Sequence, residues 1–409
     1  MNIWPFSRKS GDGASVRDSL ELFRLLGGWM ATKSGKNVSH KTALEVTTVL
    51  ACTRVIAEGI AQVPFKVYRK VGRKTEVATD HPLYRLLHRK PNAWMSSFDM
   101  REMMAIHCAL TGDAIAFKNV VLGKVVELIP IRRDCFTIKQ LDNYDLEYTI
   151  TAPNGQSRVF PREAIWHWRG PTWDGVCGLD IVKQAREAIG LAMATEESHS
   201  RMQRNGNAVG GTYSVEGKLD GKQYADLRAW LEKHFDGIEN VGKTKLLDRS
   251  AKFQPSTMTG IDAQLLETRK HQIEEICRAM RVFPIMIGHS GDKANTFASA
   301  EQMFLAHVVH TLSPWYVRIE QSGECQLLTD KELDQGYFIK FNAAGLLRGS
   351  HKDRSEYYAK ALGAGGTKGW MTQNDVRELE DLNPIDDPEA DRLPQPTNVG
   401  GQPPEETDG

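Results

Sequence analysis

The sequence predicts an α+β fold in which two long helices carry a small α/β insert between them. Three observations lead to this prediction. Short runs rich in β-branched and aromatic residues, separated by turn residues, fill the chain up to about residue 175. Two long segments with apolar residues at helical spacing follow. A compact region with both strand and helix signals separates these two segments.

Composition limits the classes of protein to which the chain can belong. Its 409 residues are enough for two or three cores, and its 52 Lys and Arg residues balance 52 Asp and Glu residues. Zero net charge argues against a protein that grips nucleic acid tightly, since such proteins need surplus cations, but not against one that surrounds it. No apolar run is long enough to span a membrane and no secretion signal opens the sequence, so we expect it to work in the cytosol.

The cysteines indicate neither a zinc site nor a disulfide framework. They are scattered and never occur in C-x-x-C spacing. We expect them to be buried thiols: Cys52, Cys108, Cys135, Cys177, Cys277 and Cys325.

The first region begins with a flexible arm over residues 1–40, which carries Gly, Ser and mixed charge without a period. A helix follows, and Pro64 marks the passage from it to the strand FKVY. A second helix, SSFDMREMMAIHCALTG, has Ser97 as its expected N-cap. The predicted strands after it are AIAFKNVV, VVELIPI, FTIKQL, YTIT and AIWHW.

The two long helices are expected over residues 179–204 and 261–280, each roughly 30 Å long at about 1.5 Å per residue. Between them we expect the strand GGTYSV, a helix from Asp220 to Phe235, and strands near KLL and KFQPS. This arrangement is a stalk with a small α/β tip. The stripe predicted on the second helix consists of Ile261, Leu265, Ile273, Ile276 and Met280.

After the second long helix, Pro284 is expected to end the helix, and a Gly- and Ser-rich loop leads into a further helix towards Glu320. Near the C-terminus we expect a helix from Ser350 to Leu362, a stop at GAGG, and a helix begun by Thr372 with Asp375 as its capping partner. The Pro-, Gly- and acid-rich end is expected to be disordered.

One motif suggests a nucleotide site. Gly237 to Thr244, GIENVGKT, fits the phosphate-binding pattern G-x-x-x-x-G-K-[ST]. Such a loop needs a strand before it and a helix N-terminus after it, but here a helix precedes the motif and the strand-like KLLDRS follows. We therefore interpret it as a helix-to-strand turn, with a nucleotide-hydrolysing packaging component kept as the alternative function.

Other candidate sites are weaker. His307 and His310 are spaced to share a helix face but lack a third metal ligand, so packing or surface positions are favoured. Trp166, His167 and Trp168 are expected in a half-buried strand. Ser290 to Lys293 fits S-x-x-K without the partner motifs of serine acylases. We predict no enzyme activity, no cofactor and no metal.

Several blocks resemble the portal proteins of long-tailed, double-stranded DNA bacteriophages. They include CTRVIAEGIAQVPFKVYRK, IWHWRGPTWDGVCGLDIVKQAREAI, DAQLLETRKHQIEEICRAMRVFPIMIG and LLRGSHKDRSEYYAKALGAGGTKGWMTQNDVRELEDLNPI. The resemblance runs from about residue 40 to 395. Where the family often has Asn, this chain has Asp113, a difference expected to matter little.

The resemblance implies a ring of usually twelve subunits, each with an outer wing, a two-helix stem, a clip, a tunnel loop and a crown. On this chain the implied parts are a flexible arm (1–40), the wing (41–178), stem helix 1 (179–206), the clip (207–259), stem helix 2 (260–282), the tunnel loop with the second part of the wing (283–345), the crown (346–395) and a disordered tail (396–409).

The resemblance also implies the partners and the sites. The ring would sit at the capsid vertex of the virion, after assembly in the host cytoplasm, in contact with the major capsid protein and no membrane. Terminase and later the head-tail adaptor would dock on the clip, and double-stranded DNA would pass through the channel. Another head-tail connector is a third alternative, although adaptors are usually much shorter.

The candidate residues follow from this assignment. The clip would offer Glu239, Asn240 and Lys243 to its partners. Lys293, in the tunnel loop, and Arg201 and Arg204, near the end of stem helix 1, could contact the DNA backbone transiently. The alternative for Arg201 and Arg204 is an ion pair with Glu267, Glu274 or Glu275 of a neighbouring stem. The tunnel loop would consist of Ser290, Gly291, Asp292, Lys293, Ala294 and Asn295.

Overall fold

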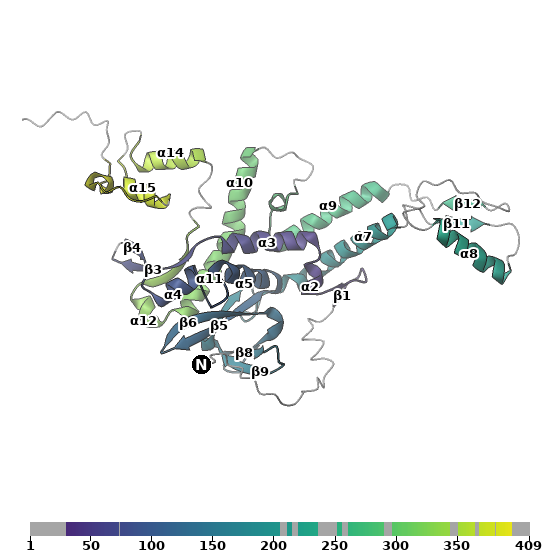
Figure 1. Ribbon diagram of the computed structural model, residues 1–409, viewed down its shortest axis with the longest axis horizontal. Helices are drawn as coiled ribbons and strands as arrows, with labels where there is room; N and C mark the ends of the chain where they lie inside the picture. Colours follow the sequence, from purple (N-terminus) through teal and green to yellow (C-terminus); the bar gives the residue numbers. More distant parts are fainter. Residues whose placement is uncertain are drawn as a thin grey trace, which may run out of the picture. The chain divides into compact units, whose positions relative to one another are not determined.

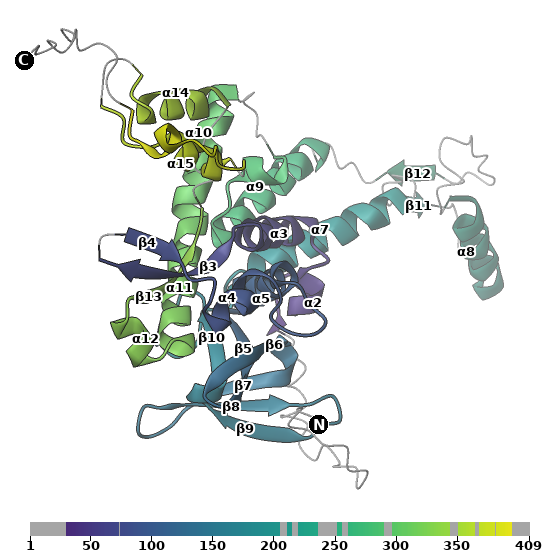
Figure 2. The ribbon, with the colours of Figure 1, turned by 60° about the vertical axis from the view of Figure 1, so that its left-hand side comes forward.

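The computed structural model describes residues 30–72, 74–204, 211–214, 220–235, 252–255, 261–289, 297–343, 351–364, 368–380 and 382–394. The chain divides into two compact units, residues 1–341 and 342–409, and each is described by itself. The first unit mixes helices with small antiparallel sheets, so the predicted α+β class is confirmed (Figures 1 and 2). None of the described helices is long and apolar enough to cross a membrane.

The helices α3 and α5 form where the sequence predicts them, whereas the short helices α2 and α4 were not predicted. Residues 30–40, which the sequence assigns to the arm, instead form two paired strands and the start of α2. The bounds are β1 (Met30–Ala31), β2 (Asn37–Val38), α2 (His40–Ala43), α3 (Thr47–Ala61), α4 (Pro82–His88) and α5 (Ser97–Thr111).

α5 begins and ends at local signals that the sequence contains. Its N-cap is Ser96, one residue before the predicted cap, and Ser96 and Asp99 form a capping box. Ser97 is buried instead, and its hydroxyl donates to the carbonyl of Leu87. Gly112 ends the helix with φ +85°, a left-handed conformation that Gly adopts without a Cβ clash.

The described part of the first unit also contains three three-stranded antiparallel sheets. Their orders are β13-β3-β4, β10-β5-β6 and β7-β8-β9. Most of these strands were predicted from the sequence, whereas β4, β9 and β13 were not. The bounds are β3 (Phe65–Val71), β4 (Lys74–Val77), β5 (Asp113–Val121), β6 (Lys124–Ile131), β7 (Phe136–Gln140), β8 (Leu146–Thr151), β9 (Ser157–Pro161), β10 (Ile165–Arg169) and β13 (Tyr337–Phe341). Short 3-10 turns lie at η1 (Arg133–Cys135) and η2 (Arg162–Ala164).

A continuous apolar cluster joins the last two of these sheets. Alternate residues of the strands point into it, as expected for sheets with one buried face. The buried members are Ile115, Ile129, Ile131, Phe136, Tyr148, Ile150 and Ile165.

Two segments that are distant in sequence share a second core. α11 (Ser313–Leu327) packs on β10 and β13, and β13 pairs with β3. Phe65 stacks on Phe341 with ring centroids 4.2 Å apart, and the Tyr316 hydroxyl donates to the Gly59 carbonyl at 2.8 Å. Trp166 is fully buried, so the expectation of a half-buried strand at β10 is wrong. Residues of α11 and β13 therefore complete a core that residues 47–169 begin.

The long helices follow. The segment expected as one helix from residue 179 is α6 (Ile181–Gln184), capped by Asp180, and α7 (Arg186–Arg204), with a break at Ala185. α9 (Ile261–Met280) matches the predicted second helix and runs beside α7 in both views (Figures 1 and 2). Between them lie β11 (Gly211–Ser214), α8 (Gly221–Phe235) and β12 (Lys252–Pro255), and β11 pairs antiparallel with β12.

α9 ends earlier than Pro284, where the sequence placed its stop. Arg281 adopts φ +56°, and the Val282 N–H donates to the Cys277 carbonyl at 2.9 Å. This is a Schellman-type end with Arg at the position that usually holds Gly. Pro284 instead begins the short helix η4 (Pro284–Ile287).

The further helix predicted before Glu320 is one interrupted rod. It consists of α10 (Phe297–His307), the π-helical turn η5 (Val308–Leu312) and α11, and the short helix α12 (Asp330–Asp334) follows. π-helical turns often mark functional positions.

The second unit holds α14 (His351–Ala361), α15 (Gln373–Leu379) and the short η6 (Pro388–Asp391). The predicted capping pair at the start of α15 is confirmed. The Thr372 N–H donates to the Asp375 carboxylate at 2.8 Å, and the Asp375 N–H donates to the Thr372 hydroxyl at 3.0 Å.

Candidate channel and docking sites

Most of the predicted site residues lie outside the described part of the chain. The tunnel-loop residues Ser290 to Asn295, which include Lys293, and the clip residues Glu239, Asn240 and Lys243 are in this group. Arg201 and Arg204 are described, as are the elements on either side of the clip and the loop. The geometry of these flanking elements fixes where the predicted sites begin and end.

The two long helices are buried at one end and exposed at the other. Ile189 on α7 and Ile276 on α9 are each 2% exposed, near the start of α7 and the end of α9. Gln272 donates to the hydroxyl of Thr195 at 3.0 Å where the helices meet. Towards the insert, the described side chains of both helices are largely exposed. The outer half of the helix pair is therefore polar, exposed surface.

Arg201 and Arg204 are both exposed on the last turns of α7. Arg201 forms an ion pair with Glu197 one turn earlier in the same helix, and Glu197 also binds Lys36. Glu275, one of the expected partners on a neighbouring stem, pairs with Arg278 within its own helix. Exposed pairs of this kind contribute little to stability, so they can exchange partners easily.

A buried polar chain that the sequence analysis did not identify lies between two sheets. The Asp113 carboxylate accepts from His167 Nε2 at 2.9 Å and from the Gly178 N–H at 2.8 Å. The Tyr148 hydroxyl lies 3.0 Å from His167 Nδ1, and all three side chains are buried. Because His167 Nε2 faces a carboxylate, we place the proton there, so Tyr148 donates to Nδ1. Asp113 is therefore a central link in the fold, and it acts as an acceptor, a role that the oxygen of Asn at this position can also fill.

Burial also shifts the pKa values of two of these hydrogen-bonded groups. Burial lowers the pKa of His167, although the hydrogen bond that His167 donates to Asp113 opposes the shift, and burial raises the pKa of Tyr148 to about 12. The three groups satisfy one another inside the protein. This arrangement positions neighbouring backbone and does not present a nucleophile to a substrate.

The backbone held in this way belongs to the loop of residues 170–178. The Asp174 carboxylate accepts from the N–H groups of Val176 and Cys177 at 2.8 and 2.9 Å, and these bonds lower its pKa. Gly178 packs so closely on Gly112 that an added Cβ would lie 2.0 Å from the Gly112 oxygen. On this tightly held loop the Trp173 side chain is 92% exposed. A rigid aromatic side chain of this kind suits protein contacts.

His307 and His310 lie in different environments and do not form a metal site with other described residues. His307 is buried and His310 is exposed, and the residues that the structure describes contain no group of three potential metal ligands. Both ring nitrogens of His307 lack a hydrogen-bond partner, and burial lowers its pKa to about 4.

The phosphate-binding motif cannot be seen directly, because residues 236–251 lie outside the described part. The helix predicted before it is confirmed as α8, which ends at Phe235. The next described element after it is the strand β12.

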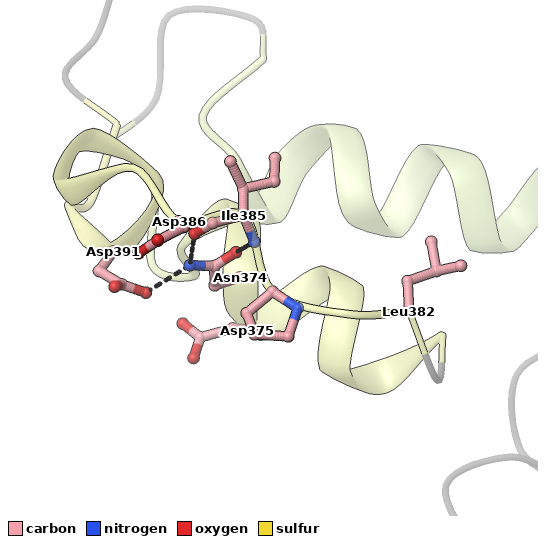
Figure 3. Close-up of a pocket in the computed structure, with 7 residues that line it drawn as sticks. Asn374, Asp375, Leu382, Ile385, Asp386 and Asp391 are labelled. Carbon is pink, nitrogen blue, oxygen red and sulfur yellow. Dashed lines mark hydrogen bonds between the residues drawn. The ribbon is translucent and has the colours of Figure 1, made fainter.

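The second unit contains a pocket of about 680 Å³ (Figure 3). Asn374 organises one wall, because its side-chain oxygen accepts from the Ile385 N–H at 2.7 Å and its amide donates to Asp391 at 2.8 Å. Three carboxylates make the pocket acidic. Its lining residues are Asn374, Asp375, Leu382, Pro384, Ile385, Asp386 and Asp391.

Comparison with known proteins identifies the family to which the chain belongs. The family model described as phage portal protein matches residues 47–381. A relative from Streptomyces phage phiC31, named "Probable portal protein", is 29% identical and aligns over 91% of this chain and 82% of its own length. The portal protein of Enterobacteria phage HK97 is 26% identical over 85% of this chain and 81% of its own length.

Two solved structures share the fold. A crystal structure of an HK97-family phage portal protein from Corynebacterium diphtheriae covers 75% of this chain and 95% of its own, with 17% identity and a TM-score of 0.55. A chain from the neck of a native gene transfer agent particle, computed with C12 symmetry, covers 90% of this chain and 95% of its own, with 22% identity and a TM-score of 0.55. The family match spans most of the chain and both halves of its fold, and this protein belongs to the phage portal protein family, which forms the capsid-vertex passage for DNA.

Proposed function

We propose that this protein assembles into a twelve-membered ring at the vertex of a phage or phage-like capsid, where double-stranded DNA enters during packaging and leaves at ejection. The observation that carries the proposal is the portal-family match over residues 47–381. The twelvefold symmetry of the gene transfer agent neck, whose chain has the same fold, supports the subunit number.

The parts of the ring follow from the chain order. Residues 41–178 and 283–345 form the wing, α7 and α9 form the stem, residues 207–259 form the clip, and residues 346–395 form the crown. The exposed outer halves of α7 and α9 support the stem assignment, because each stem in a ring needs surface for two neighbours and for the channel.

The balance of charge fits a conduit. A channel that must pass DNA in both directions should not hold it, and many unpaired cations would bind phosphates through counterion release. Arg201 is paired with Glu197, and the chain carries no net charge. Contacts of Lys293, Arg201 and Arg204 with the DNA backbone are therefore transient in this proposal, and the ring performs no catalysis of its own.

The partners follow from the position at the vertex. Terminase docks on the clip during packaging, the head-tail adaptor replaces it, and the major capsid protein surrounds the wing. Glu239, Asn240 and Lys243 are the proposed contacts of the clip. The protein resides in the virion after assembly in the host cytoplasm.

Electron microscopy of the purified full-length protein tests the ring. We expect class averages with a central hole and twelve repeated units, in the presence of scaffold or capsid protein if the isolated chain needs a partner. Monomers in every such preparation would contradict the proposal. Deletion of residues 291–294 should leave the rings intact and impair DNA packaging or retention, whereas loss of the rings would make this segment an interface.

A further inference from the structure

Two cysteines that are far apart in sequence meet inside the first unit. Cys52 lies on α3 and Cys277 on α9, and their sulfur atoms are 3.7 Å apart. Both are free thiols and almost completely buried, with 0% and 1% exposure. Both views show the end of α9 beside α3 (Figures 1 and 2). The pair therefore joins α3, in the proposed wing, to α9, the second helix of the proposed stem.

The backbone at both positions is firmly held. Cys52 lies in the interior of α3, on the buried face of this helix. The Cys277 carbonyl accepts the closing hydrogen bond of the Schellman-type end of α9, from the Val282 N–H. The two sulfur atoms are in van der Waals contact, and a disulfide requires them to approach to about 2.05 Å. This approach involves a movement of less than about 2 Å, shared between two side chains.

We propose that Cys52 and Cys277 form a disulfide bond when the protein passes from a reducing to an oxidising medium, and that this bond ties α3 to α9. The oxidant is a low-molecular-weight disulfide such as oxidised glutathione. The biological setting rests on the proposed function, because a virion leaves the reducing cytosol of its host. The chemistry of the pair does not depend on that setting.

The reaction proceeds by thiol–disulfide exchange in two steps. One cysteine gives its proton to solvent, and its thiolate attacks the small disulfide, forming a mixed disulfide and expelling one small thiolate. The second cysteine also loses its proton, and its thiolate attacks the protein sulfur of the mixed disulfide. The Cys52–Cys277 bond forms and the second small thiolate leaves, so two electrons pass from the protein thiols to the small disulfide.

The surroundings make this exchange slow. The contact between the two sulfur atoms raises the pKa of the Cys52 thiol and lowers the pKa of Cys277, so Cys277 is the thiolate that attacks first. Both sulfur atoms are buried, and a small disulfide reaches them only when α9 transiently opens from α3. This restricted access slows the exchange, so the pair stays reduced during assembly and is oxidised over the longer extracellular life of a particle.

Peptide mapping of the full-length protein tests the proposal. The protein is incubated with reduced or with oxidised glutathione, quenched with acid, denatured, alkylated and digested. We expect a cross-linked peptide that contains Cys52 and Cys277 in the oxidised sample alone, and a melting temperature at least about 3 °C higher than in the reduced sample. If both residues stay open to alkylation while the exposed Cys325 is fully converted to a mixed disulfide, the proposal is overturned.

Two variants serve as controls. Cys325→Ser removes an exposed thiol and should leave both the cross-link and the shift in melting temperature unchanged. Cys277→Val keeps an apolar side chain in place and should abolish the redox dependence of the melting temperature; a dependence that persists would contradict the assignment. If Cys277→Val does not fold, the peptide map of the natural sequence still decides. None of these measurements needs a ring or DNA, so a failure to assemble would challenge the proposed function alone.

Discussion

Asp113 links three parts of the first unit through one carboxylate oxygen. That oxygen accepts from His167 on β10 and from the backbone of Gly178, while the residue itself begins β5. Removing the Asp113 carboxylate leaves the buried imidazole N–H of His167 and the partly buried amide N–H of Gly178 without acceptors. Buried donors left without partners each cost about 1–3 kcal/mol.

We predict that Asp113→Ala lowers the free energy of unfolding by about 2–4 kcal/mol. Asp113→Asn should cost less than about 1.5 kcal/mol, because its amide oxygen can still accept both bonds. Urea unfolding followed by circular dichroism measures both. Equal losses in the two variants would show that the charge of the carboxylate, and not its role as an acceptor, stabilises the chain.

His307 makes stability depend on pH. Its pKa is lowered to about 4 in the folded protein, whereas an unfolded histidine titrates near about 6.5. The folded state therefore binds fewer protons, so the contribution of His307 is complete above about pH 6.5 and is lost as the pH falls towards 4. We expect a loss of about 1–2 kcal/mol between pH 7 and pH 5 from this residue.

His307→Leu should remove that part of the acid dependence, because neither ring nitrogen has a partner to lose. His310→Gln is the matched control, since His310 is exposed one turn away. Urea midpoints measured at pH 7 and pH 5 give the comparison. An unchanged difference between the two pH values in His307→Leu would contradict the assignment.

At the scale of elements, strong local signals were sufficient to predict structure. The apolar stripe of α9 gave its bounds, and the Thr372–Asp375 pair gave the start of α15. The assignment of the helix stop to Pro284 was wrong, because Arg281 ends α9 in a left-handed conformation that its residue type does not indicate. β13 was missed because its partner β3 lies at the other end of the chain, so only the fold supplies the pairing.

Arg281 also supports a prediction about its helix. Since a non-glycine residue is strained at φ +56°, Arg281→Gly should raise the free energy of unfolding by about 0.5–1 kcal/mol. Arg278→Gly, an exposed change inside the same helix, should lower it by about 1 kcal/mol. Chemical denaturation of the two variants gives opposite signs if the left-handed turn ends α9. A loss of stability in both would indicate that the Arg281 side chain contributes contacts that outweigh the strain.

At the scale of the whole molecule, the family could be identified from sequence, and the comparisons confirm it. The proposed contacts of the clip and tunnel loop stay predictions, because those residues lie outside the described part of the chain. The Asp113–His167–Tyr148 chain could not be predicted, since nothing in residue spacing shows that strands β5, β8 and β10 bring these side chains together.

The nucleotide-binding alternative can be decided on the intact protein. We expect no binding of ATP at micromolar concentrations, and the same result for Lys243→Ala, when binding is measured by isothermal titration calorimetry. A phosphate loop opens directly into a helix, whereas α8 precedes the motif here. Binding that disappears in Lys243→Ala would favour a packaging motor over a conduit.

The core shared by Phe65 and Phe341 has a consequence for synthesis of the protein. β3 leaves the ribosome early, but its partner β13 follows only after α7, α9, the segment between them and the long rod of α10 and α11 have been made. The sheet of β13, β3 and β4 therefore cannot be completed while most of the chain is still being translated. During that interval the apolar face of β3 is open to any neighbouring nascent chain, so the rate of elongation and the supply of chaperones should govern the yield of assembly-competent subunits.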